Sequence, residues 1–417
     1  MRKTPKSLRL QIGLFGRTNV GKSTFLNYVA SQDVAITSPL PGTTTDVVEK
    51  AMELLPVGPV VFLDTAGIDD VSPLSGLRTE KTRQVFRRAD IFVLLTEPGV
   101  WGSYEEKISL AAKEHEAGLI VVINKIDTAE PKEEFIKKVE KATAHIVRCS
   151  CLDRNSRDRT ISEFKQAVID TCPEDFFTPP PLVGDLIPPG GLALLIVPID
   201  LQAPRGRLIL PQVQVLRDSL DNERLAMVVK ENAIGQAIGK LKGLPDLAVC
   251  DSQVVDRMVA DLPLKVPCTT FSMLFARYKG DLGETVRGVA AIDSLKEGDR
   301  VLIAESCSHH PISDDIGRIK IPAWMKRYKG FDIPFDVFAG RDYPEDMSRY
   351  RLIVHCGGCM ITRREVLHRV RKAREMNIPI TNYGVTISFL QGVLERVLTP
   401  FPEELEMYRS LRGGNKA

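Results

Sequence analysis

The hydrophobic positions in the first third of the chain form short apolar runs that alternate with helical patterns. Residues 10–15, 60–63 and 119–123 are rich in apolar side chains, and a helical pattern opens at Thr24, soon after the first run. Alternation of this kind is typical of parallel sheets with helices packed on their faces. The first third therefore predicts an α/β domain.

The same alternation returns twice in the rest of the chain. Strands are predicted at residues 192–197, 225–229 and 247–250, with helical patterns over 211–220 and 233–241. Four later strand-like runs each end in polar residues, at 300–304, 334–338, 352–354 and 378–380. If these four strands share one parallel sheet, their ends meet at its carboxyl edge, where open α/β folds build sites. We therefore expect two further α/β domains with mainly parallel sheets.

A segment rich in proline and glycine, residues 173–191, has the composition of a linker. It suggests a P-loop domain over 1–172, a small α/β domain over 192–269 and a third domain over 270–417. The length of 417 residues fits two or three domains at roughly 150 residues each.

The first apolar run leads into a complete GxxxxGK[ST] phosphate loop, residues 16–23, and the loop opens a helix. Its backbone N–H groups and the helix N-terminus are suited to hold phosphates. Lys22 is placed to reach the β and γ phosphates, and the Ser23 hydroxyl to bind Mg²⁺. The loop predicts a nucleoside triphosphate site.

Two further segments fit the γ phosphate and its metal ion. The strand at 60–63 ends in Asp64-Thr65-Ala66-Gly67. Asp64 would lie in the outer shell of Mg²⁺, and the Gly67 N–H would face the γ phosphate. The hydroxyl-rich segment 42–46 suits a switch loop, with Thr44 as a Mg²⁺ ligand. We expect Lys22, Thr44 and Gly67 to be the catalytic groups.

The strand at 119–123 ends in Asn124-Lys125-Ile126-Asp127. The Asp127 carboxylate can accept from both the ring N1–H and the exocyclic amine of guanine, whereas adenine presents the reverse pattern. Together these segments resemble the nucleotide motifs of translation-factor-related GTPases, with Ser150-Cys151 resembling the base-contacting Ser-Ala pair. The expected nucleotide-binding residues are Gly16, Asn19, Val20, Gly21, Lys22, Ser23, Thr24, Asp64, Gly67, Asn124, Lys125, Asp127, Ser150 and Cys151.

Two positions refine the expected hydrolysis. Residue 68 is Ile, where Ras-type GTPases carry a glutamine that positions water, so intrinsic hydrolysis should be slow or need another activating element. Asn19 stands where potassium-stimulated GTPases of this class carry an asparagine that helps hold K⁺. By that resemblance we expect hydrolysis that is stimulated by K⁺.

The net charge and the cysteine content argue against several other classes of protein. The net charge of +2 argues against a surface given over to nucleic acid. No segment reaches the ~18 apolar residues of a membrane span, and eight cysteines are too few for a disulfide scaffold. A cytoplasmic protein with reduced thiols, no membrane and no nucleic acid is the expectation. Five cysteines look passive: Cys149, Cys151, Cys172, Cys250 and Cys268.

The other three cysteines follow predicted strands. Cys307 comes after the run at 300–304, and Cys356-x-x-Cys359 after the run at 352–354, with two glycines between the paired thiols. Three thiolates suit a 4Fe-4S cluster with one iron left to another ligand, and zinc in a Cys₃His site is the competing interpretation. Candidates for the fourth ligand or its surroundings are His309, His310, His355, Asp314, Asp315 and water.

The whole arrangement resembles the FeFe-hydrogenase maturation GTPases, the HydF family. Cys307-Ser308-His309 and His355-Cys356-Gly357-Gly358-Cys359 match that family's cysteine signature. The resemblance implies a homodimeric scaffold that holds a 4Fe-4S cluster at the three cysteines. It also implies that a diiron precursor arrives from two radical S-adenosylmethionine maturases and is delivered to apo FeFe-hydrogenase.

Alternatives remain open at this point. One is a ribosome- or RNA-associated GTPase with a zinc-stabilised C-terminal domain, and another is an iron–sulfur redox enzyme. The helix expected after the cysteine loop opens with a capping box, Thr362-x-x-Glu365, and has an apolar stripe at Val366, Val370 and Ala373. Its basic residues predict either a solvated face or an electropositive rim for an anionic partner: Arg363, Arg364, Arg369, Arg371, Lys372 and Arg374.

Overall fold

The computed structural model describes residues 5–30, 48–64, 75–177, 180–199, 208–306, 315–340, 343–344 and 346–413. The chain divides into two compact units, Met1–Pro179 and Pro180–Ala417. Among the described residues, no helix has the length and hydropathy needed to cross a bilayer.

The first unit is built on one six-stranded sheet with the order β2-β3-β1-β4-β5-β6. All neighbouring strands are parallel except β2 and β3. Its strands are β1 (Leu10–Gly16), β2 (Val48–Leu54), β3 (Gly58–Asp64), β4 (Ile91–Thr96), β5 (Gly118–Ile123) and β6 (Ile146–Arg148). Its helices are α1 (Lys22–Ala30), α2 (Ser75–Arg88), α3 (Ser103–Glu114), α4 (Glu133–Glu140), α5 (Arg157–Thr171) and α6 (Glu174–Phe177).

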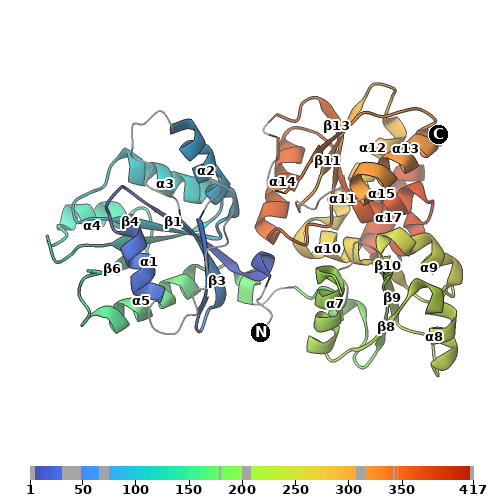
Figure 1. Cartoon of the computed structure of the whole chain (residues 1–417), viewed down its shortest axis with the longest axis horizontal. Helices are drawn as coiled ribbons and strands as arrows, with labels where there is room; N and C mark the ends of the chain where they lie inside the picture. Colours follow the sequence, from blue (N-terminus) through green and yellow to red (C-terminus); the bar gives the residue numbers. More distant parts are fainter. Residues whose placement is uncertain are drawn as a thin grey trace. The chain divides into compact units, whose positions relative to one another are not determined.

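Helices cover both faces of this sheet, as Figure 1 shows with α1 and α5 on one side and α2 and α3 on the other. Alternate residues of β1 point to opposite faces, so Ile12 packs with Phe25 of α1 and Phe164 of α5, whereas Phe15 packs with Val85 of α2. Burial on both faces explains why the strands are short apolar runs in the sequence.

The second unit contains two four-stranded parallel sheets. The first has the order β10-β9-β7-β8. Its strands are β7 (Leu192–Ile196), β8 (Leu225–Val229), β9 (Leu247–Cys250) and β10 (Cys268–Thr270), joined through α7 (Leu210–Asp221), α8 (Ile234–Lys240) and α9 (Val255–Asp261). Strand β8 is an edge strand, and among the described residues it pairs with β7 alone.

The second sheet has the order β12-β11-β13-β14, with every pair parallel. Its strands are β11 (Arg300–Ala304), β12 (Phe335–Phe338), β13 (Tyr350–His355) and β14 (Ile380–Asn382). The helices of this part are α10 (Phe271–Lys279), α11 (Leu282–Val289), α12 (Ala291–Ser294), α13 (Ile321–Lys329), α14 (Arg363–Glu375), α15 (Tyr383–Leu390), α16 (Leu394–Val397) and α17 (Pro402–Gly413).

Alternation along β11 and β13 divides their side chains between two cores. Leu302 and Ile353 pack with Val370 and Ala373 of α14. Ile303 of β11 and Val354 of β13 belong to the core on the other face of the sheet. Figure 1 shows α14 on one side of β11 and β13, with α11 and α15 on the other. The predicted apolar stripe of α14 is therefore its buried face.

The sequence prediction of three α/β segments with mainly parallel sheets is confirmed. The last strand differs in its limits, because β14 covers Ile380–Asn382 and not the expected 378–380. Its backbone pairs with β13 up to His355, which draws the polar Thr381 and Asn382 into the sheet. A single hydrophobic core runs from Leu182 to Tyr408 through both sheets of the second unit. The boundary between the second and third domains, placed between residues 269 and 270, stays a prediction.

Candidate functional site

The phosphate loop joins β1 to α1 and depends on two glycines. Gly16 and Gly21 have φ of +148° and +97°, in the region that favours glycine. A Cβ on Gly16 would lie 2.7 Å from the Leu95 carbonyl oxygen, and one on Gly21 would lie 2.4 Å from Asn124 Nδ2. Any side chain at either position would push the loop away from β4 or from the base-binding segment.

Helix α3 contacts the loop from the side, a contact that no sequence pattern predicts. Arg17 Nε and Nη2 donate to the two Glu105 carboxylate oxygens at 2.7 and 2.8 Å. The Gly16 N–H donates to the Tyr104 hydroxyl at 3.1 Å. Burial alone would raise the pKa of Glu105, but the Arg17 hydrogen bonds and the Gly102 N–H outweigh it and the pKa is lowered. The carboxylate therefore stays ionised.

Lys22 and Asp64 lie at the phosphate end of the site. Lys22 is buried and its Nζ donates to the Gly16 and Arg17 carbonyl oxygens at 2.5 and 2.8 Å. Asp64 ends β3, and its buried Oδ1 has no hydrogen-bond partner among the described residues. Burial raises the pKa of Asp64, and Lys50 and Lys22 oppose the rise. A carboxylate oxygen without a partner beside the phosphate loop is suited to accept a hydrogen bond from a water molecule bound to Mg²⁺.

Asn124 connects the phosphate loop to the segment that is predicted to contact the base. Its Nδ2 donates to the Val20 carbonyl at 2.9 Å, and its Oδ1 accepts from the Cys151 N–H at 3.2 Å. The buried Cys149 thiol also donates to this Oδ1 at 3.6 Å. One buried side chain thus fixes three segments that are far apart in the sequence.

The other predicted base and loop residues surround Asn124. Lys125 has a φ of +61°, and its Nζ donates to the Asn19 carbonyl at 2.8 Å and to Glu97 Oε1 at 2.5 Å. Ser150 is buried, while the side chain of Asp127 is exposed where a base would be read. Asn19, Ser23 and Thr24 are exposed around the start of α1. Among the described residues the structure brings the predicted nucleotide ligands to one edge of the sheet.

Seven predicted residues lie outside the described part of the chain. In the first unit these are Thr44, Gly67 and Ile68; in the second unit they are Cys307, His309, His310 and Asp314.

The second candidate site is the loop between β13 and α14, residues 356–359. Ala304 and His355 face each other on the neighbouring strands β11 and β13, so the segments that follow them leave the sheet side by side. The Ser306 N–H donates to Cys356 Sγ at 3.0 Å, and the Cys356 thiol donates to the Ser306 hydroxyl at 3.1 Å. Cys307 is the next residue in the sequence. The sheet topology therefore brings Ser306, which precedes Cys307 in the sequence, into contact with the loop that carries Cys356.

The loop turns back at Gly358, whose φ of +65° favours glycine. A Cβ there would lie 3.0 Å from Val366 Cγ2. Helix α14 then begins, with Thr362 Oγ1 accepting from the Glu365 N–H as the predicted cap requires. Burial raises the pKa of the Cys359 thiol to about 11, Cys356 adds to the rise and Lys279 opposes it.

His355 has both ring nitrogens engaged. Nε2 lies 3.1 Å from Arg369 Nη1 and Nδ1 lies 2.5 Å from the Cys356 carbonyl oxygen. A guanidinium can only donate, so Nε2 accepts, Nδ1 carries the proton and donates to the carbonyl. Burial, with Arg369, lowers the pKa of His355 to about 3, so the ring is neutral. This arrangement favours a supporting role behind Cys356 over a role as ligand.

Lys279 lies behind the same loop and was not anticipated from the sequence. It ends α10, is 1% exposed, and donates from Nζ to the carbonyl oxygens of Gly358, Cys359 and Ile361. The three distances are 3.2, 3.2 and 2.8 Å. About 80 residues separate Lys279 from the loop, and no sequence signal links them.

One basic residue of helix α14 is buried, which neither sequence interpretation expected. Arg369 is 2% exposed, donates to the Gly340 carbonyl and stacks over the Tyr343 ring. Arg363 donates to the Tyr278 carbonyl, and Arg374 pairs with Glu284. These three charges hold α14 against its neighbours, so they do not form a free electropositive rim.

The donor set fits an iron–sulfur cluster or another thiolate-bound metal. Cys356 receives an N–H hydrogen bond to its sulfur, Cys359 is a half-buried free thiol, and a buried cation lies behind both. Cys356 and Cys359 would be two ligands, and Cys307 is expected as the third. No group of three or more metal-binding side chains forms among the described residues alone.

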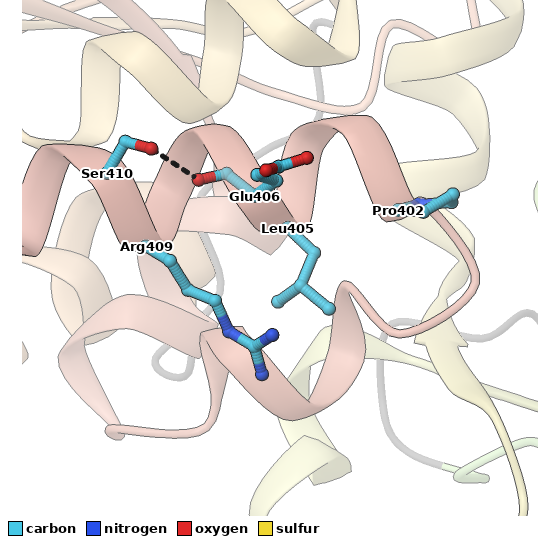
Figure 2. Close-up of a pocket in the computed structure, with 5 residues that line it drawn as sticks. All are labelled: Pro402, Leu405, Glu406, Arg409 and Ser410. Carbon is cyan, nitrogen blue, oxygen red and sulfur yellow. Dashed lines mark hydrogen bonds between the residues drawn. The ribbon is translucent and has the colours of Figure 1, made fainter.

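A pocket elsewhere on the second unit has a different character. It is lined by five residues of one helix, Pro402, Leu405, Glu406, Arg409 and Ser410 of α17 (Figure 2). The Ser410 hydroxyl donates to the Glu406 carbonyl within the helix, and Arg409 pairs with Glu395. It contains none of the predicted site residues.

The phosphate loop, the base-reading segment and the mainly parallel sheet together define a P-loop GTPase. Such an enzyme binds GTP and GDP with Mg²⁺ and hydrolyses GTP. In this chain two further α/β segments follow the GTPase unit. Residues 11–125 match the model described as 50S ribosome-binding GTPase. Residues 182–280 match the hydrogen maturase F dimerization domain, and 283–400 match its tetramerization domain, together more than half of the chain. The chain belongs to the HydF family of hydrogenase maturation GTPases.

Curated relatives match mainly by GTPase sequence. A tRNA modification GTPase MnmE from Roseiflexus castenholzii is 40% identical over 115 residues, which are 27% of this chain and 24% of that protein. GTPase Era from Thermoanaerobacter sp. is 30% identical over 250 residues, 55% of this chain and 79% of that protein. The chain thus spans about a quarter of the length of the MnmE relative. Among solved structures, Aquifex aeolicus Era bound to GDP and AlF₄⁻ is 28% identical, covering 39% of this chain and 57% of that chain with a TM-score of 0.32.

Proposed function

We propose that this chain is a GTP-hydrolysing scaffold that binds a 4Fe-4S cluster through Cys307, Cys356 and Cys359. It would receive a diiron precursor from two radical S-adenosylmethionine maturases and deliver it to apo FeFe-hydrogenase. Membership of the HydF family supports this role. The observation that carries it is the loop at Cys356, where an N–H group is aimed at the sulfur and a buried cation lies behind.

The residues of this chain have separable tasks in the proposal. Cys356 and Cys359 would hold iron as thiolates, while the Ser306 N–H stabilises negative charge on one sulfur. His355 and Arg369 keep the end of β13 in place from behind. A cluster with one exchangeable iron ligand would supply a docking point for a bridging group. In the first unit, Lys22 and the loop amides would bind phosphates and Asp64 would orient a Mg²⁺-bound water.

Anaerobic reconstitution with iron and sulfide tests the proposal. We expect a brown protein with about four irons per chain, as for one cubane cluster, and transfer of the diiron unit to apo-hydrogenase. A colourless protein that holds a single zinc would contradict the cluster and revive the zinc-stabilised alternative. The family match over residues 182–400 favours the maturation role over that RNA-associated alternative.

We also propose that K⁺ stimulates GTP hydrolysis through Asn19. Its side chain is exposed at the phosphate loop, its φ is +63°, and its carbonyl is fixed by Lys125. A cation beside the phosphates would offset the charge that develops during hydrolysis. We expect the turnover rate to be at least about tenfold higher in KCl than in NaCl at equal ionic strength. Equal rates in the two salts would contradict the proposal.

The dimerization and tetramerization matches support oligomerisation, and we propose that β8 forms part of a homodimer interface. It is an edge strand within the dimerization match, and Leu225 and Val228 are 60% and 42% exposed. Leu220 and Val213 of α7 extend the exposed apolar surface. Unpaired edge strands with apolar side chains favour pairing with a second copy.

Placing charges on this edge should separate the copies. For Leu225→Lys with Val228→Lys we expect the dissociation constant of the dimer to rise at least about tenfold, because two lysines would be desolvated at the interface. Light scattering across a concentration series measures it. Leu264→Lys is the control, since Leu264 is 86% exposed and precedes β10, the strand at the opposite edge of the sheet from β8. An unchanged dimer in the double variant would rule out this edge.

A further inference from the structure

The most unusual charged side chain of the second unit is Lys279. At 1% exposure its ammonium group is as buried as the apolar core, and lysine is almost never fully buried without a partner. Among the described residues no carboxylate forms an ion pair or hydrogen bond with it, although Glu365, which pairs with Arg369 at 3.5 Å, also stabilises its charge. The charge is satisfied by three carbonyl oxygens and by the Phe275 ring, 5.6 Å from Nζ.

All three carbonyl oxygens belong to one short segment. They come from Gly358, Cys359 and Ile361, so one ammonium group spans the second half of the cysteine loop and its exit toward α14. A neighbouring contact reinforces this junction, since Arg363 at the start of α14 donates to the Tyr278 carbonyl at 2.7 Å. The end of α10 therefore sets the path of the loop that presents Cys359.

A buried cation without a directly paired carboxylate gains from further negative charge nearby. Transferring an ammonium group into a protein interior costs several kcal/mol unless charge nearby offsets it. The two thiols lie on this loop, and negative charge on Cys359, on Cys356 or on the Glu365 carboxylate would each stabilise the ammonium group of Lys279. Thiolates bound to a metal keep a net negative charge that protonated thiols lack.

We propose that Lys279 is a positioning residue of the cysteine site. Its three hydrogen bonds fix the backbone that carries Cys359, and its charge offsets that of a thiolate-bound iron–sulfur group held by Cys356 and Cys359. This inference rests on the proposed function. It assigns to α10 a residue that neither belongs to the cysteine motif nor touches a sulfur atom.

Two variants separate the two contributions of Lys279. Lys279→Met keeps the chain length and removes both the charge and the donors, while Lys279→Gln removes the charge and keeps an amide donor. Lys296→Met is the matched control, because Lys296 is exposed in the same unit. Each full-length protein is reconstituted anaerobically with iron and sulfide, and iron is counted per chain.

The measurements are the rate of iron loss to a chelator and the reduction potential of the cluster. For Lys279→Met we expect iron loss to be about 10-fold to 100-fold faster, the range for outer-shell partners of metal ligands. The potential should fall in both variants, since a nearby cation stabilises the reduced, more negative form. In Lys279→Gln, iron loss should be slower than in Lys279→Met because part of the hydrogen bonding remains.

Each result has a defined meaning. Wild-type iron loss and potential in Lys279→Met would overturn the inference and leave the proposed function intact. If Lys279→Met does not fold, Lys279→Gln decides, and a wild-type potential in that variant overturns the inference. A wild-type protein that takes up no iron at all would overturn both.

Discussion

Lys22→Ala should abolish measurable GTP hydrolysis, with turnover reduced at least about 100-fold. Lys22 is buried at the base of the loop, and its Nζ donates to the Gly16 and Arg17 carbonyl oxygens. When phosphates bind, the same ammonium group has only to turn from these carbonyls to the β and γ oxygens. An alanine leaves the developing charge of the transition state without that cation.

Phosphate release under single-turnover and multiple-turnover conditions measures the effect. Lys107→Ala on the exposed side of α3 is the matched control, and it should hydrolyse GTP at the wild-type rate. The iron content of Lys22→Ala after reconstitution should equal that of wild type, because the cysteine loop belongs to the other compact unit. Residual hydrolysis above about a tenth of wild type would contradict the role given to Lys22.

Cys359→Ser and Cys356→Ser should each abolish stable cluster binding, taking iron from about four per chain to less than about one. A serine hydroxyl is a harder and less acidic donor than a thiol, so it does not replace a thiolate on iron. The effect should be at least as large at Cys356, because its sulfur also accepts a hydrogen bond from the Ser306 N–H. A serine oxygen at this position would lie closer to the backbone than the sulfur does, so it would not accept that hydrogen bond with the same geometry.

Iron analysis and the visible absorption of the reconstituted protein measure this loss. Cys172→Ser is the control, since Cys172 is a half-buried thiol of the first unit and far along the chain from the loop. GTP hydrolysis should stay at the wild-type rate in both loop variants. Full iron content in Cys359→Ser would exclude that residue as a ligand, and loss of hydrolysis would contradict the separation of tasks between the two units.

Local spacing was enough to place the nucleotide motifs. A phosphate loop needs glycines, a lysine and a hydroxyl at fixed offsets between a strand and a helix, and Gly16, Gly21 and Lys22 show that offset in the sequence. The strands were equally visible, because strands buried on both faces are short apolar runs. Several strand limits moved by one or two residues, and the shift at β14 involves Thr381 and Asn382, which are polar but pair with β13.

Contacts between distant segments were hidden from the sequence. Glu105, Arg369 and Lys279 look like ordinary surface charges on helices, yet their exposures are 0%, 2% and 1%. What distinguishes them is a partner far away in the chain, such as Arg17, His355 or the carbonyls of the cysteine loop. Pairing between distant segments follows from the fold and produces no periodic pattern in the sequence.

The sequence by itself determined the class of the protein, its nucleotide loop and the cysteines that would hold a metal, because each depends on residues at short, fixed spacing. The tertiary structure alone decided what surrounds them. The strand order β12-β11-β13-β14 places β11 beside β13, so Ser306 meets Cys356, and the packing of α10 against α14 places Lys279 behind Cys359. These arrangements depend on which strands pair and which helices pack, and those choices minimise the free energy of the whole unit and not of any one segment.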